Sequence, residues 1–131
     1  MTGNVETIAY SRAYQPPAPV AELRVEAPGR AQRGRPLTAL IDSGADATLI
    51  PIDVLDEVGA RHVGDATLRG WAGDRYPADI YLVNLIIGAH TIPAVRVAAV
   101  PEGAEPVLGR NALNHPIITL NGPAAMTEIA A

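Results

Sequence analysis

The sequence predicts a mostly β fold with one or two short helices. From Val20 onward, short apolar stretches are broken repeatedly by glycine and proline, of which the 131-residue chain has 12 each. This punctuation is typical of all-β domains, because strands end where such residues form turns. Hydrophobic residues make up 48% of the chain and charged residues 18%, a composition that supports a packed core. We therefore expect one domain, closed as a β-barrel.

The chain divides into a proline-rich N-terminal arm at 1–19, a folded domain at 20–123 and a flexible tail at 124–131. Glycine and proline breaks separate the apolar runs of the domain into short strands. The expected strands are 20–27, 37–41, 48–50, 63–69, 76–87, 91–100, 107–108 and 117–120.

Two helices and two hairpins are expected between these strands. Pro51 suits the first turn of a short helix that stops at Gly59, and residues 109–114 fit one or two further turns. Glycine-containing connections at 70–74 and 88–90 predict hairpins.

Charge and composition exclude several function classes. The net charge of −4 opposes a general binder of nucleic acid or anionic membrane, whose affinity needs clustered positive charge. The absence of cysteine excludes disulfides and a thiol nucleophile. No apolar stretch reaches the ~18 residues of a membrane span, and no signal-peptide pattern is present. These observations predict a cytoplasmic protein.

Histidines and a basic turn offer no clear ligand site in the sequence. His62, His90 and His115 lie far apart and lack the His-Glu-x-x-His spacing, so neither a metal nor a cofactor is expected. The arginines of residues 30–35 lie between two strands without interleaved aromatic residues. They are interpreted as a solvated turn rather than a nucleic-acid contact.

The most informative residues are Asp42, Ser43 and Gly44, directly after the apolar strand at 37–41. A carboxylate at the end of a buried strand needs hydrogen bonds or a partner to offset its desolvation. The Ser43 hydroxyl can supply a hydrogen bond, and Gly44 allows close approach of a ligand or an unusual backbone conformation. Asp-Ser-Gly is also common in ordinary Asx turns, so a structural turn and a reactive carboxylate both remain open.

The flanking residues carry a resemblance. Residues 39–51 read Ala-Leu-Ile-Asp-Ser-Gly-Ala-Asp-Ala-Thr-Leu-Ile-Pro, and residues 107–114 read Val-Leu-Gly-Arg-Asn-Ala-Leu-Asn. The first segment resembles the active-site signature of aspartic proteases of the retroviral type, the retropepsins. The second resembles the Gly-Arg-Asp/Asn segment before their C-terminal helix. The resemblance covers residues 20–123 and implies a retropepsin-like closed barrel, with the hairpin at 70–74 as the flap.

The resemblance implies an aspartic endopeptidase that hydrolyses polypeptides. Two carboxylates sharing one proton would activate a water, and like charges so close cannot both ionise. The chain has a single Asp-Ser-Gly, so Asp42 would have to come from each subunit of a homodimer. Residues 117–120 and part of the N-terminal arm would help to build the dimer interface.

Roles for other residues follow from the resemblance alone. Ser43 would bond across the dimer axis, Gly44 would offer its carbonyl to substrate, and Asp46 would form an ion pair with Arg110. The residues expected to contact substrate come from the active-site loop and the flap tip. They are Gly44, Ala45, Asp46, Trp71, Ala72 and Gly73, with packing in the core as an equal alternative for Trp71.

A second hypothesis belongs to a different class. The same fold could serve as a non-catalytic peptide-binding or dimerisation module, because Ser43 and a flap tip with few glycines depart from the retroviral pattern. An intact Asp42 opposes this hypothesis, since an idle site has little reason to keep a costly carboxylate pair.

Overall fold

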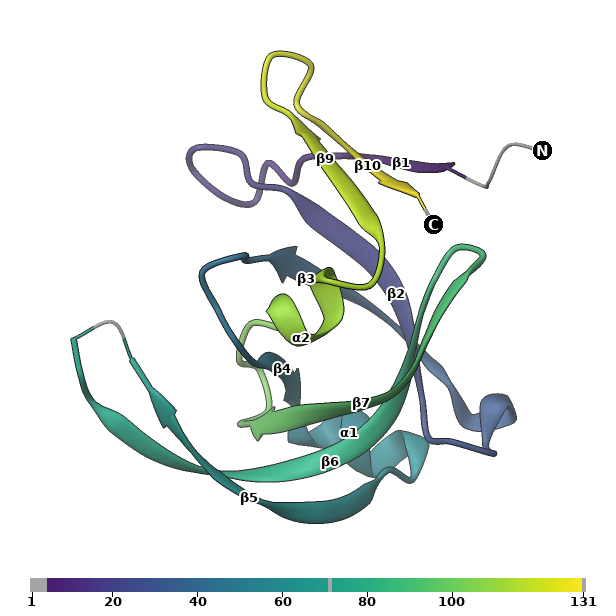
Figure 1. Cartoon of the computed structure of the whole chain (residues 1–131), viewed down its shortest axis with the longest axis vertical. Helices are drawn as coiled ribbons and strands as arrows, with labels where there is room; N and C mark the ends of the chain where they lie inside the picture. The colour runs from purple at the N-terminus through teal and green to yellow at the C-terminus, as the bar shows by residue number, and fades with distance from the viewer. Residues whose placement is uncertain (1–4, 71, 131) are drawn as a thin grey trace.

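The structure is a computed structural model of the whole chain, and it describes residues 5–70 and 72–130. It is mostly β with two short α-helices, as the sequence predicts (Figure 1). The helices are α1 (Ile52–Val58) and α2 (Arg110–Leu113), and a 3-10 turn covers Ala31–Arg33. The strands are β1 (Val5–Ala9), β2 (Val20–Glu26), β3 (Arg35–Ile41), β4 (Thr48–Pro51), β5 (Arg61–Arg69), β6 (Arg75–Ile87), β7 (His90–Val100), β8 (Val107–Leu108), β9 (Ile117–Asn121) and β10 (Met126–Ala130).

The larger sheet has seven strands in the order β2-β3-β8-β4-β7-β6-β5. An additional antiparallel pairing of β2 with β6 joins this sheet back on itself, so that β5 alone lies outside the ring. The short strand β8 runs parallel to β3 and antiparallel to β4. This arrangement brings the ends of β3 and β8 together, beside the start of α2.

Helix α1 covers part of the core. Its apolar face buries Val54, Leu55 and Val58, and it ends at Gly59, whose φ of +74° suits glycine. The arginines of the basic turn contact this helix: Arg33 donates to the Glu57 carbonyl at 2.9 Å, and Arg35 pairs with the Glu57 carboxylate at 2.7 Å. The basic turn therefore stabilises the end of α1 and the approach to β3.

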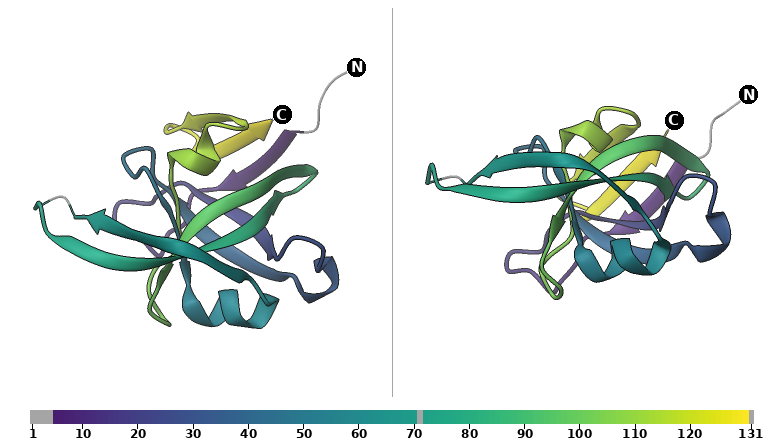
Figure 2. Two further views of the ribbon diagram at one scale, coloured as in Figure 1. Left: turned by 60° about the horizontal axis from the view of Figure 1, so that its bottom comes forward. Right: turned by 90° about the horizontal axis from the view of Figure 1, so that it is seen from below.

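A separate three-stranded sheet, in the order β1-β10-β9, lies above the ring (Figures 1 and 2). The prediction of a flexible tail at 124–131 was wrong, because residues 126–130 form the central strand of this sheet. Thr127 and Ile129 are buried and alternate with exposed Glu128, the period-2 pattern of a strand with one covered face. The N-terminal arm likewise contributes β1 to the sheet.

None of the helices in the described part of the chain is both long enough and apolar enough to cross a membrane.

Candidate active site

Asp42 stands at the point where β3 leaves the ring. Its backbone N–H donates to the Leu108 carbonyl of β8 at 3.1 Å. This hydrogen bond ties the main chain of Asp42, at the end of β3, to β8. Its side chain is half-buried, and Oδ1 accepts the backbone N–H of Gly44 at 2.9 Å. The Ala45 N–H donates to the Asp42 carbonyl at 3.1 Å and closes the turn. The Asx turn therefore holds the half-buried Asp42 carboxylate in one orientation.

Gly44 is needed here for space rather than for an unusual backbone angle. A Cβ atom at this position would lie 3.1 Å from Asp42 Oδ1, and the φ angle of Gly44 is not in the left-handed region. A larger residue would crowd the carboxylate oxygen that the Gly44 N–H now contacts. The glycine keeps the approach to Asp42 open.

Helix α2 holds the loop that carries Asp42. The Arg110 N–H donates to the Ala45 carbonyl at 2.8 Å, and Arg110 Nη1 donates to the Ser43 carbonyl at 2.8 Å. The ion pair expected between Asp46 and Arg110 is absent from those that the described residues form. In this chain the guanidinium binds a main-chain oxygen of the loop, and the Asp46 side chain is exposed.

Thr48 is a further positioning residue, which sequence reasoning missed. It is fully buried, its Oγ1 donates to Asn111 Oδ1 at 2.7 Å, and it accepts the Gly109 N–H at 3.1 Å. Asn111 in turn donates to the Arg96 carbonyl of β7 at 2.8 Å. One hydroxyl thereby links the end of the active-site loop to α2 and, through the amide, to β7. Thr48 belongs to the first sequence motif, and Gly109 and Asn111 belong to the second. Neither motif alone indicates that these residues form hydrogen bonds with each other.

We expect Thr48→Val to lower the free energy of unfolding by about 2 kcal/mol, although valine has nearly the same shape. The change leaves the buried Gly109 N–H without its acceptor and the side-chain oxygen Oδ1 of Asn111 without its donor. A buried group left unpaired costs roughly 1–3 kcal/mol. Urea denaturation would measure the loss. Thr91→Val, at an exposed position of β7, is the control and should change stability by less than about 0.5 kcal/mol. Equal stability of both variants would show that the hydroxyl does not hold the loop.

Gly109, which precedes α2, packs closely against the active-site loop. A Cβ atom there would overlap the Ala47 carbonyl oxygen and would lie 2.5 Å from the Ala47 carbonyl carbon. Both atoms belong to the main chain and cannot rotate away. The close approach of α2 to the active-site loop therefore requires glycine at this position.

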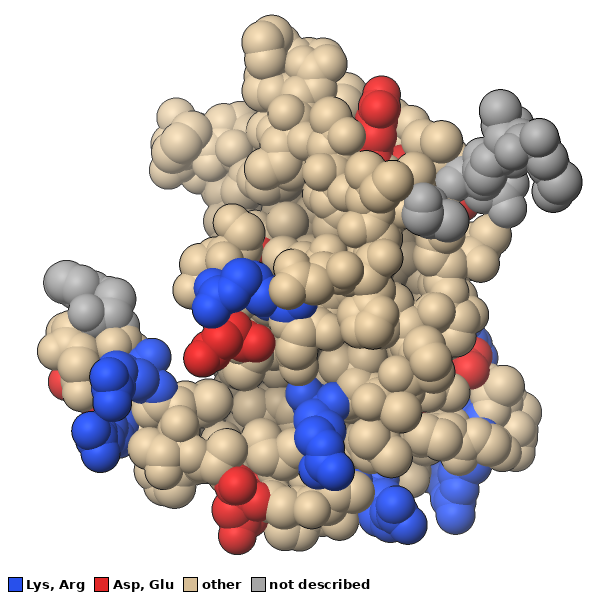
Figure 3. Space-filling model, in the orientation of Figure 1, with Lys and Arg blue, Asp and Glu red and all other residues tan. Residues whose placement is uncertain are grey.

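The β5–β6 hairpin projects from the body of the molecule (Figure 1). The space-filling view shows a hollow between the hairpin and the body (Figure 3). At its tip the Gly70 N–H donates to the Asp74 carbonyl at 2.9 Å, and Gly73 has a φ of +89°. A pocket of about 530 Å³ lies between hairpin and site, with walls from the active-site loop, α2 and β5. Its lining residues are Asp46, Ala47, Ala66, Thr67, Leu68, Arg69 and Asn111. An extended chain laid in this hollow would pass beside the loop that carries Asp42.

The structure places the predicted substrate-contact residues at two places. Gly44, Ala45 and Asp46 follow Asp42 in the active-site loop, while Ala72 and Gly73 are exposed at the hairpin tip. Trp71, expected to act at the tip, lies outside the described residues. Among the residues that the structure describes, the side chains grouped so that they could hold a metal ion are on the β5–β6 hairpin rather than beside Asp42.

Comparison with known proteins agrees with this geometry. A family model described as "gag-polyprotein putative aspartyl protease" matches residues 31–115, more than half of the chain. A search of curated protein sequences found no match.

Two of the solved structures that match illustrate the shared fold. A retropepsin-like aspartic protease from Rickettsia conorii superposes with a TM-score of 0.65 at 12% identity, covering 100% of this chain and 98% of the other. The EIAV protease complexed with the inhibitor HBY-793 superposes with a TM-score of 0.59 at 19% identity, covering 82% of this chain and 92% of the other. The chain therefore has the retropepsin-like fold and belongs to the family of retropepsin-like aspartic proteases.

Proposed function

We propose that the protein is an aspartic endopeptidase that is active as a homodimer, with Asp42 of each subunit forming the catalytic dyad. The observation that carries this proposal is the Asp42 carboxylate itself. It stands at the end of a strand and is oriented by a hydrogen bond from the Gly44 N–H. Its loop is held in place by the hydrogen bonds from Arg110 of α2. Such bracing keeps a reactive group in one geometry, which a catalytic carboxylate requires.

The mechanism follows from two carboxylates that share one proton. The ionised carboxylate accepts a proton from a water as that water attacks the scissile carbonyl carbon. The protonated one donates its proton to the carbonyl oxygen. The tetrahedral intermediate then collapses: one of its hydroxyls returns a proton to the ionised carboxylate, the C–N bond breaks, and the leaving amine takes the proton of the other carboxylate. The hollow beneath the β5–β6 hairpin holds the substrate extended beside the dyad, and closure of the hairpin would exclude bulk water.

The second carboxylate must come from another copy, and the structure offers an edge for that copy. Strand β9 is an edge of the three-stranded sheet and follows directly after α2, which braces the active-site loop. It exposes two large apolar side chains, Ile117 at 62% and Leu120 at 53%. The visible surface around this sheet is almost free of charged side chains (Figure 3). An unpaired apolar edge is a template for pairing with another strand. We place the two-fold contact at this edge, where β9 of one subunit pairs with β9 of its partner.

We expect Ile117→Asp combined with Leu120→Asp to convert the dimer to monomers and to remove peptide cleavage with it. Buried carboxylates facing each other across a two-fold axis oppose association strongly. Analytical ultracentrifugation at several protein concentrations would measure the shift. The matched control is Val5→Asp on β1, the opposite edge of the same sheet, where the side chain is 57% exposed. Dissociation by Val5→Asp instead would place the interface at β1 and contradict the β9 contact.

The test of the proposed function is cleavage of a mixed peptide library by the wild-type protein between pH 3 and pH 9. A dyad that shares one proton is active only between its two titration steps, since full protonation removes the base and full ionisation removes the acid. We expect a bell-shaped profile with its maximum below neutrality. Activity that rises steadily to pH 9 would contradict the dyad. Absence of cleavage by a folded dimer, together with retained peptide binding, would favour the non-catalytic binding module.

A further inference from the structure

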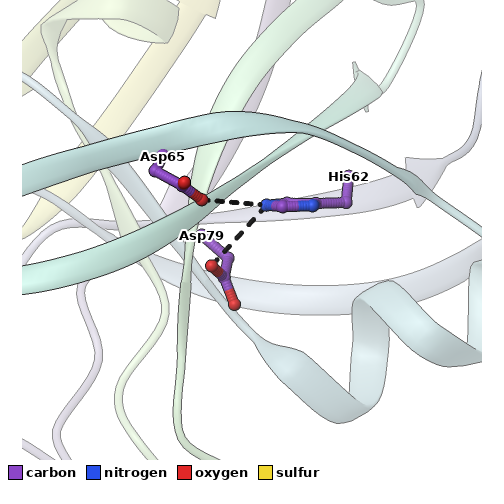
Figure 4. Close-up of side chains that lie close together, drawn as sticks. All are labelled: His62, Asp65 and Asp79. Carbon is purple, nitrogen blue, oxygen red and sulfur yellow. Dashed lines mark hydrogen bonds and ion pairs between the residues drawn. The ribbon is translucent and has the colours of Figure 1, made fainter.

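A cluster of three potential metal ligands lies on the outer strand pair β5–β6, and nothing in the proposed catalytic mechanism uses it. The side chains are His62 and Asp65 from β5 and Asp79 from β6 (Figure 4). His62 Nε2 lies 3.2 Å from Asp65 Oδ1 and 3.6 Å from Asp79 Oδ1, and the three ligand atoms are all within 4.8 Å of one another.

A β-bulge brings the imidazole to the carboxylates. His62 pairs with Tyr81, and Asp65 pairs with Asp79, with a register shift between His62 and Gly64. Residues three apart on a regular strand point to opposite faces, so His62 and Asp65 would be separated without the extra residue. With the bulge, both side chains point to the face that Tyr81 and Asp79 share. The His62 ring also packs against the Tyr81 ring, with 5.4 Å between the ring centroids.

The charges of this cluster are not balanced by neighbouring arginines. Asp65 and Asp79 stand directly opposite each other on adjacent strands, where like charges are destabilising. The sequence has no lysine, and within the described ranges the ion pairs of both carboxylates are with His62 alone. This face therefore offers a cation two carboxylates and an imidazole nitrogen.

The distances fit one class of ion. A tetrahedral zinc ion bound at about 2.0–2.2 Å from each nitrogen or oxygen ligand holds the ligand atoms about 3.4 Å apart. The two separations from His62 Nε2 bracket this value, so the nitrogen and either oxygen can bind zinc with little movement. Calcium prefers six to eight oxygen ligands and magnesium an octahedron of oxygens, and a nitrogen ligand suits neither. The side chains are 50%, 79% and 63% exposed for His62, Asp65 and Asp79, so water can reach a fourth position.

We propose that His62, Asp65 and Asp79 bind a zinc ion that links strands β5 and β6 below the hairpin tip. The ion neutralises the opposed carboxylates and ties the two strands of the hairpin together across their ladder. The spacing of the three histidines could not predict this site, because two of its three ligands are carboxylates and one ligand comes from another strand.

The test is binding of Zn²⁺ to the untagged full-length protein by isothermal titration calorimetry. We expect saturable binding of one ion per chain, and no comparable binding of Mg²⁺ or Ca²⁺. His62→Ala and Asp79→Asn should each weaken binding by more than about tenfold, since even the loss of an outer-shell partner costs 10–100-fold. His115→Ala, which removes another exposed imidazole, should leave affinity unchanged.

A second measurement keeps the test independent of any folding defect. In NMR spectra of the wild-type protein, zinc should shift the imidazole signals of His62 and leave those of His115 in place. Absence of saturable binding would overturn the proposal, as would equal affinity of the wild type and both ligand variants. Because neither measurement uses peptide cleavage, the result is separate from the proposed protease activity.

Discussion

We expect the Asp42→Asn variant to cleave peptides about a thousandfold more slowly than the wild type, or worse. Acid–base groups contribute roughly 10²–10⁴ to a rate, and at the dimer axis this single substitution removes both members of the dyad. Asparagine keeps an oxygen at the position of Oδ1, so the hydrogen bond from the Gly44 N–H at 2.9 Å can persist. The loop and the dimer should therefore survive a change that removes the chemistry. Steady-state cleavage of a peptide selected from the library would measure the rate.

The control for this variant is Asp56→Asn, at an exposed position of α1. It removes the same charge from the surface and should leave the cleavage rate unchanged. Sedimentation of the Asp42→Asn protein should show the same dimer as the wild type. Full activity of an Asp42→Asn dimer would exclude Asp42 as the catalytic carboxylate.

The Gly109→Ala variant should lose about 3 kcal/mol of stability, a large share of the total for a domain of this size. Overpacking alone costs about 1–3 kcal/mol, and the hydrogen bond from Gly109 to Thr48 adds about 1 kcal/mol when it is lost. The added methyl group would overlap the main chain at Ala47, so either α2 or the active-site loop must move. Movement of the loop would also break the contact between the Arg110 N–H and the Ala45 carbonyl. Urea denaturation would measure the loss of stability. The rate of peptide cleavage would report whether the displaced loop still presents Asp42 for catalysis.

The comparison for Gly109 is Gly122→Ala, in the turn before β10. No atom lies within 4 Å of a Cβ there, and φ is not positive, so stability should change by less than about 0.5 kcal/mol. If Gly109→Ala is as stable as Gly122→Ala, the packing of α2 on the loop is looser than the structure shows.

The sequence was sufficient to predict the mostly β class, because glycine and proline separate apolar runs whose lengths suit strands. Most predicted strands begin and end within a few residues of the observed ones. The strand predicted at 37–41, for example, corresponds to β3 at Arg35–Ile41. The tail was missed because the pattern of β10 has only two buried positions, Thr127 and Ile129, next to an alanine-rich turn. Such a short alternation becomes recognisable only when β1 and β9 are seen on either side of it.

The candidate site also contains residues that the sequence could predict and residues that it could not. Asp42 was singled out because its flanking residues resemble the retropepsin signature, since Asp-Ser-Gly alone is also common in ordinary turns. The link from Thr48 to Asn111 joins residues 63 positions apart, and no local pattern encodes such a bond. The cluster at His62 was hidden for a third reason. A β-bulge changes which residues share a face, and sequence periodicity assumes a regular strand.

The pairing of β1 with β10 brings the two ends of the described part of the chain together. Val5 lies opposite Ala130 on adjacent strands, which run about 5 Å apart. A short linker between Val5 and Ala130 could therefore close this part of the chain into a circle. New ends could then be opened in the mostly exposed loop that connects β7 to β8. A circular permutation of this kind would change the order of the strands along the chain and is expected to keep the contacts around Asp42.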